Sequence, residues 1–191
     1  MAKELKRTTK ETDIRIVANL KGNGISKIDT GIGFFNHMLE AFTKHSYMDL
    51  EVTCRGDLDV DFHHSVEDVG IVLGQVLRDL IYPLENVERF ANSVVVMDEA
   101  AVECDIDLSN RAYLVYEIDM DGKIGDFDAE LCEEFFRAVV VNAGISMHII
   151  KRRGKNRHHI AEAAFKAFAV SLRRALVENA RAGTPSTKGM L

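Results

Sequence analysis

A short histidine-rich segment occurs twice in this chain, and this repetition constrains the fold more than any other feature. The first copy spans 61–67 (DFHHSVE) and the second, ninety-five residues later, spans 156–162 (NRHHIAE). Each copy has two adjacent histidines, a carboxylate three residues after the second histidine, and then helix-forming sequence. Two copies in similar surroundings predict an internal duplication, with half-repeats at 1–88 and 89–191 inside one compact domain.

Hydrophobic periodicity predicts strands, a helix, a strand and a helix in each half. The first half should have strands at 13–20, 25–28 and 50–54, with the first two forming a hairpin, and helices at 34–44 and 65–81. The second half should have strands at 93–97, 101–108, 113–118 and 147–151, one helix after Gly125 and one after the second histidine pair. Gly70 and Gly74 lie one helical turn apart, where another backbone could approach closely. The pattern predicts an α+β fold, an internally duplicated two-layer sandwich in which each half is a mostly antiparallel or mixed sheet with helices on one face.

Four imidazoles and two carboxylates in the two copies make a metal-ligand set. Adjacent side chains diverge, so a single ion should not bind both histidines of a pair. The second histidine and the glutamate share a helical face. We infer two similar metal sites, each formed by a histidine and a glutamate of one copy and completed by a histidine of the other. One such segment alone is as easily a surface accident, but two copies favour metal binding. Nitrogen and oxygen donors favour manganese, iron or a similar first-row ion, and zinc stays open.

Composition sets further bounds on the protein class. The chain has 191 residues, 47% hydrophobic content and a net charge of −6, which suits one domain with a core and argues against a nucleic-acid partner. No apolar run approaches the ~20 residues of a membrane span, and the N-terminus lacks an apolar signal core, so we expect a soluble cytoplasmic protein without a membrane partner. Cys54, Cys104 and Cys132 have no C-x-x-C spacing and should be core residues, not disulfides or zinc thiolates.

Several other segments, taken in order, resemble the imidazoleglycerol-phosphate dehydratase family of histidine biosynthesis. They are 7–12 (RTTKET), 35–39 (FNHML), 97–100 (MDEA), 107–111 (DLSNR), 159–166 (HIAEAAFK) and 186–189 (STKG). The resemblance spans nearly the whole chain and implies the monofunctional form of the enzyme. It implies a hydro-lyase that removes water from imidazole glycerol phosphate to give imidazole acetol phosphate, with a ribosomal protein S5 domain 2-like fold.

The resemblance also implies two Mn²⁺ ions per active site, with the substrate's imidazolate held between them. The implied metal ligands are His37, His63, His64, Glu67, His148, His158, His159 and Glu162. The implied catalytic residues are Glu11, His45 and Glu162. The implied substrate-binding residues are Glu11, His37, His45, His63, His64, Glu67, Arg89, Arg111, His158, Lys166, Ser186, Thr187 and Lys188. Without the resemblance, His37 and His148 would be interpreted as structural histidines and Glu11 as a solvated surface residue.

The family implies a homo-oligomer, a 24-subunit shell whose active sites lie at subunit interfaces and whose assembly depends on metal. Asn36 stands where the family commonly has aspartate, and we expect it to affect a hydrogen bond to a metal-binding histidine. Two other function classes stay open. A dinuclear metallohydrolase would cleave phosphate esters, and a noncatalytic module would bind metal or RNA without turnover. An assay with manganese and imidazole glycerol phosphate separates them.

Overall fold

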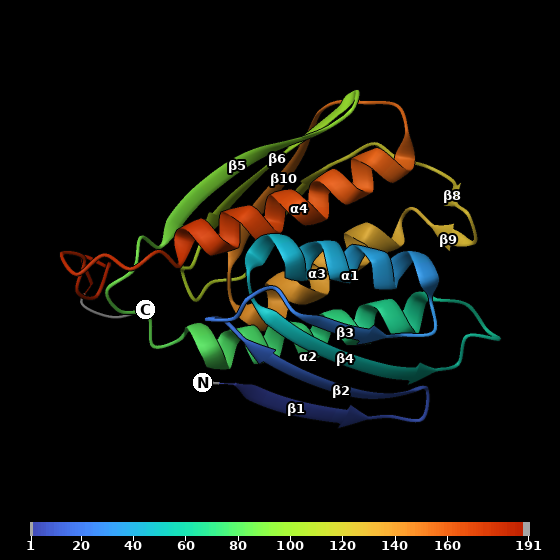
Figure 1. Ribbon diagram of the computed structural model, residues 1–191, viewed down its shortest axis with the longest axis horizontal. Coiled ribbons are helices and arrows are strands. Elements are labelled where there is room, and N and C mark those ends of the chain that lie inside the picture. Colours follow the sequence, from blue (N-terminus) through green and yellow to red (C-terminus); the bar gives the residue numbers. More distant parts are fainter. Residues whose placement is uncertain (1, 189–191) are drawn as a thin grey trace.

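The computed structural model describes residues 2–188, which form two four-stranded sheets, one two-stranded sheet and four helices. The four helices lie between the two large sheets (Figure 1). The first half consists of β1 (Lys3–Thr8), β2 (Thr12–Asn19), β3 (Ser26–Asp29), α1 (Gly33–Ser46), β4 (Asp49–Gly56) and α2 (His63–Ile81). The second half consists of β5 (Phe90–Met97), β6 (Ala100–Asp107), β7 (Tyr113–Glu117), β8 (Lys123–Ile124), β9 (Phe127–Asp128), α3 (Leu131–Ala143), β10 (Ser146–Arg153) and α4 (Arg157–Ala175).

The two large sheets have the same topology, which confirms the predicted duplication. Their strand orders are β1-β2-β4-β3 and β5-β6-β10-β7. In each sheet the first two pairs are antiparallel and the last pair, β3 with β4 or β7 with β10, is parallel. The expected hairpin between the strands at 13–20 and 25–28 is wrong. Strand β3 pairs with β4 and not with β2, and α1 connects β3 to β4 so that these two strands run parallel. The sequence interpretation also missed β1, an edge strand rich in charged residues.

The core lies where the helices of the two halves meet. Helix α2 packs on α3, and α1 packs on α4. A Cβ atom at Gly74 would lie 2.7 Å from the Val139 carbonyl oxygen, and one at Gly70 would lie 2.9 Å from the Phe135 carbonyl oxygen. The predicted close approach at these glycines is therefore confirmed, and the approaching backbone is that of α3. The three cysteines are buried and unbridged, Cys54 and Cys104 in strands and Cys132 in α3, as expected of core residues.

The two histidine pairs lie at the starts of α2 and α4. The Asp61 side chain accepts a 2.7 Å hydrogen bond from the His63 amide. The Asn156 side chain accepts hydrogen bonds of 2.9 and 3.3 Å from the amides of His158 and His159. These contacts satisfy amides that have no partner within a helix, and they fix where each helix begins. Helices α1, α2 and α4 all begin at the same end of the molecule, on the right in Figure 1. Among residues 2–188, no helix is long and apolar enough to cross a membrane.

Candidate metal centre

Three side chains from α1 and α4 form a cluster that can bind a cation. The Nε2 atoms of His37 and His158 each lie 3.2 Å from Oε2 of Glu162. One ligating atom from each residue lies within 4.8 Å of the other two. Glu162 is buried, whereas both imidazoles are partly accessible to solvent. The cluster therefore presents two ring nitrogens and one shielded carboxylate at the edge of the helix layer.

Lys166 keeps the buried carboxylate of this cluster ionised. Its Nζ lies 2.7 Å from Oε1, the other oxygen of Glu162. Burial acts to raise the pKa of Glu162, but the Lys166 ammonium and His37 outweigh it, so the pKa is lowered overall. Burial lowers the pKa of His45, and the charges of Lys166 and Arg173 act in the same direction. This shift favours the neutral imidazole of His45, which lies eight residues after His37 on α1.

The first histidine segment forms a sparser group on α2. His63 Nε2 lies 3.8 Å from Glu67 Oε2, and Glu11 Oε2 lies 3.9 Å from His64 Nδ1. Within residues 2–188, only the His37–His158–Glu162 cluster brings three ligating atoms together. The expectation that a histidine of the other copy completes this site is not met within one chain. In the three-residue cluster, the member that joins His158 and Glu162 of α4 is His37. It comes from α1 because α4 packs on α1, whereas α2 packs on α3.

A carboxylate contacts Nδ1 of the second histidine in each pair. Asp57 Oδ2 lies 2.9 Å from His64 Nδ1, and Glu99 Oε2 lies 2.7 Å from His159 Nδ1. These contacts raise the pKa of both histidines, and the hydrogen bond with His159 lowers the pKa of Glu99 to about 2. Sequence reasoning assigned no role to either carboxylate, although the segment 97–100 contains Glu99.

The Asn36 side chain binds the loop before α1 and, among residues 2–188, no histidine of its own chain, so its expected effect on a metal-binding histidine stays a prediction. Its Oδ1 accepts hydrogen bonds of 2.9 Å from the Thr30 amide and 2.6 Å from the Thr30 hydroxyl. The residue therefore fixes the approach to α1, the helix that carries His37.

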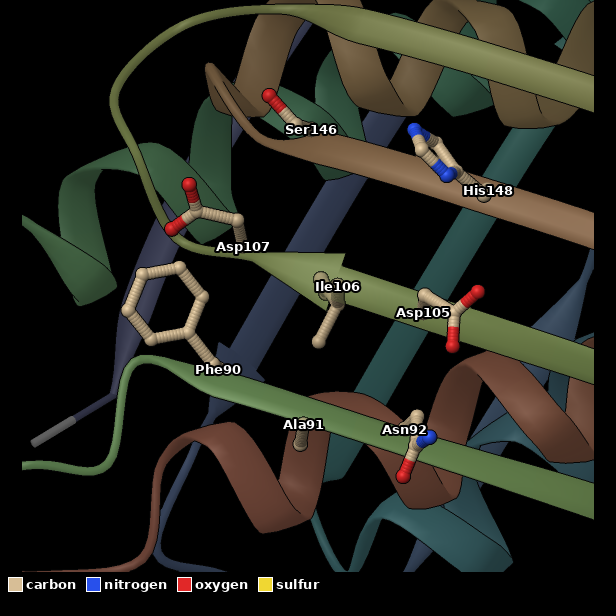
Figure 2. Close-up of a pocket in the computed structure, with 8 residues that line it drawn as sticks. All are labelled: Phe90, Ala91, Asn92, Asp105, Ile106, Asp107, Ser146 and His148. Atoms are coloured by element: carbon tan, nitrogen blue, oxygen red, sulfur yellow. The ribbon is translucent and has the colours of Figure 1, made fainter.

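His148 lies away from the cluster of its own chain. Its neighbours on β10, Met147 and Ile149, are fully buried, whereas His148 is exposed, so its side chain leaves the sheet on the face opposite the helices. Figure 2 shows His148 on this outer face beside Asp105, its cross-strand partner on β6. Ser146 projects from the same face of β10. If His148 binds the same ion as His158, it does so from another chain.

Five of the implied substrate-binding residues gather in one pocket, of about 340 Å³. It is lined by Arg89, Ser109, Asn110, Arg111, Ser186, Thr187 and Lys188. Gly189, the end of the quoted segment, lies outside the described residues. Lys166 does not line this pocket but contacts Glu162. Three cationic side chains in one small pocket suit a phosphate dianion.

The phosphate-type pocket and the metal-type cluster lie at opposite ends of α4. The Arg89 amide donates a 2.9 Å hydrogen bond to the carbonyl of Ala175, the last residue of α4, whereas Glu162 lies in its second turn. At 1.5 Å per residue, Glu162 and Ala175 are about 20 Å apart along the helix axis.

Comparison with known proteins gives a consistent match along the chain. The family model for imidazoleglycerol-phosphate dehydratase matches residues 30–172. The chain is 66% identical to the imidazoleglycerol-phosphate dehydratase of a Nitratiruptor species over 98% of this chain and 99% of the relative, and 61% identical to that of Wolinella succinogenes over 99% and 100%. The crystal structure of the Staphylococcus aureus enzyme matches with a TM-score of 0.85 and 40% identity, over 94% of this chain and 100% of that one. The Pyrococcus furiosus enzyme in complex with (S)-C348 matches with a TM-score of 0.83 and 37% identity, over 98% and 100%.

Proposed function

Because the chain belongs to the imidazoleglycerol-phosphate dehydratase family, we propose that it dehydrates imidazole glycerol phosphate with two Mn²⁺ ions, in active sites that two chains share. The family assignment carries the hydro-lyase reaction in histidine biosynthesis. The observation that carries the proposal is the separation of the metal-type cluster from the phosphate-type pocket along α4.

The donor set at the start of α4 fits a first-row divalent ion. His37, His158 and Glu162 offer two imidazole nitrogens and one carboxylate oxygen, and Glu162 is ionised despite its burial. Such mixed nitrogen and oxygen donors suit Mn²⁺ or a similar ion. Four other proposed metal ligands lie at the starts of α2 and α4, at the same end of the molecule: His63, His64, Glu67 and His159.

A substrate cannot span the two groups within one chain. The phosphorus of the substrate lies about five bonds of roughly 1.5 Å from the imidazole ring, which is far less than the ~20 Å along α4. His148, by contrast, lies on β10 close to the residues that line the phosphate-type pocket. Ser146, two residues before it on β10, donates a 3.0 Å hydrogen bond to the Arg111 carbonyl, and residues two apart on a strand are separated by about 6.6 Å. A phosphate held by Arg111 would therefore leave the ring close to His148.

We accordingly propose that each active site is formed by two sets of residues, one from each of two chains. One chain supplies the cluster of His37, His158 and Glu162, and a second chain supplies His148 with the phosphate pocket. The oligomer that satisfies this requirement in the family is the 24-subunit shell, and we propose it for this chain.

The chemistry requires help with a weakly acidic proton. The proton to be removed is on a carbon attached to the ring, and no unaided carboxylate removes it at a useful rate. Bound metal ions would supply Lewis acidity and a template for the ring. Glu11 lies at the turn between β1 and β2, exposed and 3.9 Å from His64, where its carboxylate can accept or return a proton. Both oxygens of Glu162 are engaged, which favours a ligand role over proton transfer. We assign His45, whose pKa is lowered by burial, as a second acid–base group.

The reaction itself is tested by a direct assay. Purified protein supplied with Mn²⁺ and imidazole glycerol phosphate should form imidazole acetol phosphate. Release of inorganic phosphate without the ketone would favour a metallohydrolase, and metal binding without turnover would favour a noncatalytic module.

The shared site is tested by mixing two inactive variants. Glu162→Gln damages the metal cluster and Arg111→Ala damages the phosphate pocket. If two chains share each site, random co-assembly of equal amounts should give about a quarter of sites with both contributions intact, and hence about a quarter of the wild-type rate. The matched control mixes Glu162→Gln with His158→Gln, which damage the same contribution and should stay inactive. No recovery in the first mixture, with both variants co-assembled, would contradict the shared site.

A further inference from the structure

The second histidine of each pair has a carboxylate at the same ring nitrogen. Glu99 Oε2 lies 2.7 Å from His159 Nδ1, and Asp57 Oδ2 lies 2.9 Å from His64 Nδ1. We propose that Glu99 and Asp57 are positioning residues that hold the proton of each imidazole on Nδ1 and so leave Nε2 as the metal-binding nitrogen. This inference rests on the proposed metal-dependent function.

The assignment follows from what each group can donate. A neutral imidazole has one N–H and one lone pair, whereas an ionised carboxylate can only accept. The nitrogen that contacts the carboxylate must therefore carry the hydrogen. At His159 the other nitrogen, Nε2, has Asp98 Oδ2 at 3.7 Å, which is too long for a hydrogen bond. Its lone pair stays free for an ion.

The register of the two sheets identifies Glu99 as the counterpart of Glu11. Ala18 pairs with Leu50, the second residue of β4, and Ile106 pairs with Met147, the second residue of β10. Glu11 lies seven residues before Ala18 (18 − 11), and Glu99 lies seven residues before Ile106 (106 − 99). The same position in the two halves thus carries a carboxylate beside the second histidine.

Glu99 and Glu11 differ in the hydrogen bonds that fix their side chains. Glu99 Oε1 accepts hydrogen bonds of 3.2 and 2.8 Å from the amides of Lys155 and Asn156, so this side chain is fixed between the loop and His159. Glu11 is 3.9 Å from His64, and Asp57 makes the close contact there instead. The Asp57 amide also donates a 3.1 Å hydrogen bond to the Glu11 carbonyl. One half therefore uses this glutamate to position a ring, and the other leaves it free to move a proton.

Glu99→Gln tests the inference with little change in shape. Gln keeps one oxygen for the loop amides, but its NH₂ group faces Nδ1 and can only donate, which moves the ring hydrogen to Nε2. Histidine ¹⁵N NMR of the metal-free protein at about pH 9, where imidazoles are neutral, should show His159 with its hydrogen on Nδ1 in wild type and on Nε2 in the variant. Calorimetry should show Mn²⁺ binding weakened by roughly 10–100-fold.

Two controls make the result specific. Glu103→Gln removes a carboxylate that is ion-paired with Arg152 on the same sheet, and it should leave both the tautomer and the affinity unchanged. Asp57→Asn should repeat the shift at His64 and leave His159 as in wild type. Retention of hydrogen on Nδ1 of His159 in Glu99→Gln, whatever the affinity, would overturn the inference. A wild-type protein with the expected tautomer but no Mn²⁺ binding would instead count against the proposed function.

Discussion

Arg89, which lines the proposed phosphate pocket, forms a two-point ion pair with Asp107. Arg89 Nε donates to Asp107 Oδ1 at 2.7 Å, and Nη2 donates to Oδ2 at 3.2 Å. Nη1 donates to the Pro185 carbonyl at 2.6 Å. Three of the five N–H donors of a guanidinium are thus used for positioning, and two remain for a ligand.

Arg89→Lys should weaken substrate binding without affecting metal content. Lysine cannot hold Asp107, Pro185 and a phosphate at once, because it lacks the planar fork. Loss of a charged hydrogen bond costs about 1.5–3 kcal/mol, so kcat/KM should fall by roughly 10–100-fold, mainly through KM. Arg137→Lys, in an exposed ion pair with Glu133, is the control and should leave the kinetics unchanged. An unaltered KM in Arg89→Lys would contradict this role.

Glu162→Gln should lower the amount of bound manganese and abolish turnover. The substitution removes the only carboxylate of the three-residue cluster and leaves Lys166 without its ion-pair partner. Metal analysis after gel filtration, together with the dehydratase assay, measures both effects. Glu40→Gln, an exposed residue on α1, should retain metal and activity. Normal metal content with a normal rate in Glu162→Gln would refute the metal centre.

Removal of metal should break the assembly into smaller species. If an ion bridges His148 of one chain and the cluster of another, chelation removes a contact between subunits. Light scattering should then report a loss of particle mass that Mn²⁺ restores. A full-sized particle after complete chelation would argue against metal-linked assembly.

Gly74→Ala should destabilise the protein, although alanine is the better helix former by about 1 kcal/mol. The new Cβ would lie 2.7 Å from a backbone oxygen of α3, so the helices must separate. Overpacking of this kind costs typically about 1–3 kcal/mol. Urea denaturation measures the change. Gly33→Ala, where a Cβ meets nothing within 4 Å, should be neutral or slightly stabilising; equal stability changes in the two variants would show that helix contact does not limit this site.

The three thiols should resist modification in the folded state. Burial raises the pKa of Cys54 to about 11 and that of Cys132 to about 12, and burial also raises the pKa of Cys104. The reactive thiolate is therefore scarce at about pH 8. An aromatic disulfide reagent should modify none of them in the native protein and all three after unfolding. Rapid reaction of one thiol in the native protein would indicate local opening around it.

Much of the fold could be predicted from the sequence, because the duplicated segment and the apolar periodicities are local signals. The predicted helix over 34–44 and strand over 13–20 lie within one or two residues of α1 and β2. The predicted pairing of β3 was wrong, since periodicity says where a strand is and not which neighbour it joins. β1 was missed because an edge strand buries little, and its charged side chains hide the alternation.

The candidate site could be predicted only in part. The phosphate pocket joins Arg89, Arg111 and Lys188, which are far apart in sequence, and the resemblance alone suggested that they belong together. Glu99 and Asp57 act through contacts with histidines sixty and seven residues away, and no spacing rule identifies such pairs. The separation of His148 from the cluster depends on which face of β10 is buried, a tertiary property.

The segment that joins the two halves is tied to the C-terminal segment by backbone hydrogen bonds. The Asn86 amide donates to Gly183, and the Asn179 amide donates back to Asn86, each at 2.7 Å. Shortening the protein from its C-terminal end would therefore do more than delete Ser186 and Lys188 from the phosphate pocket. Removal of Asn179 and Gly183 as well would break both hydrogen bonds with Asn86, so one C-terminal segment serves substrate capture and anchors the segment that joins the two halves.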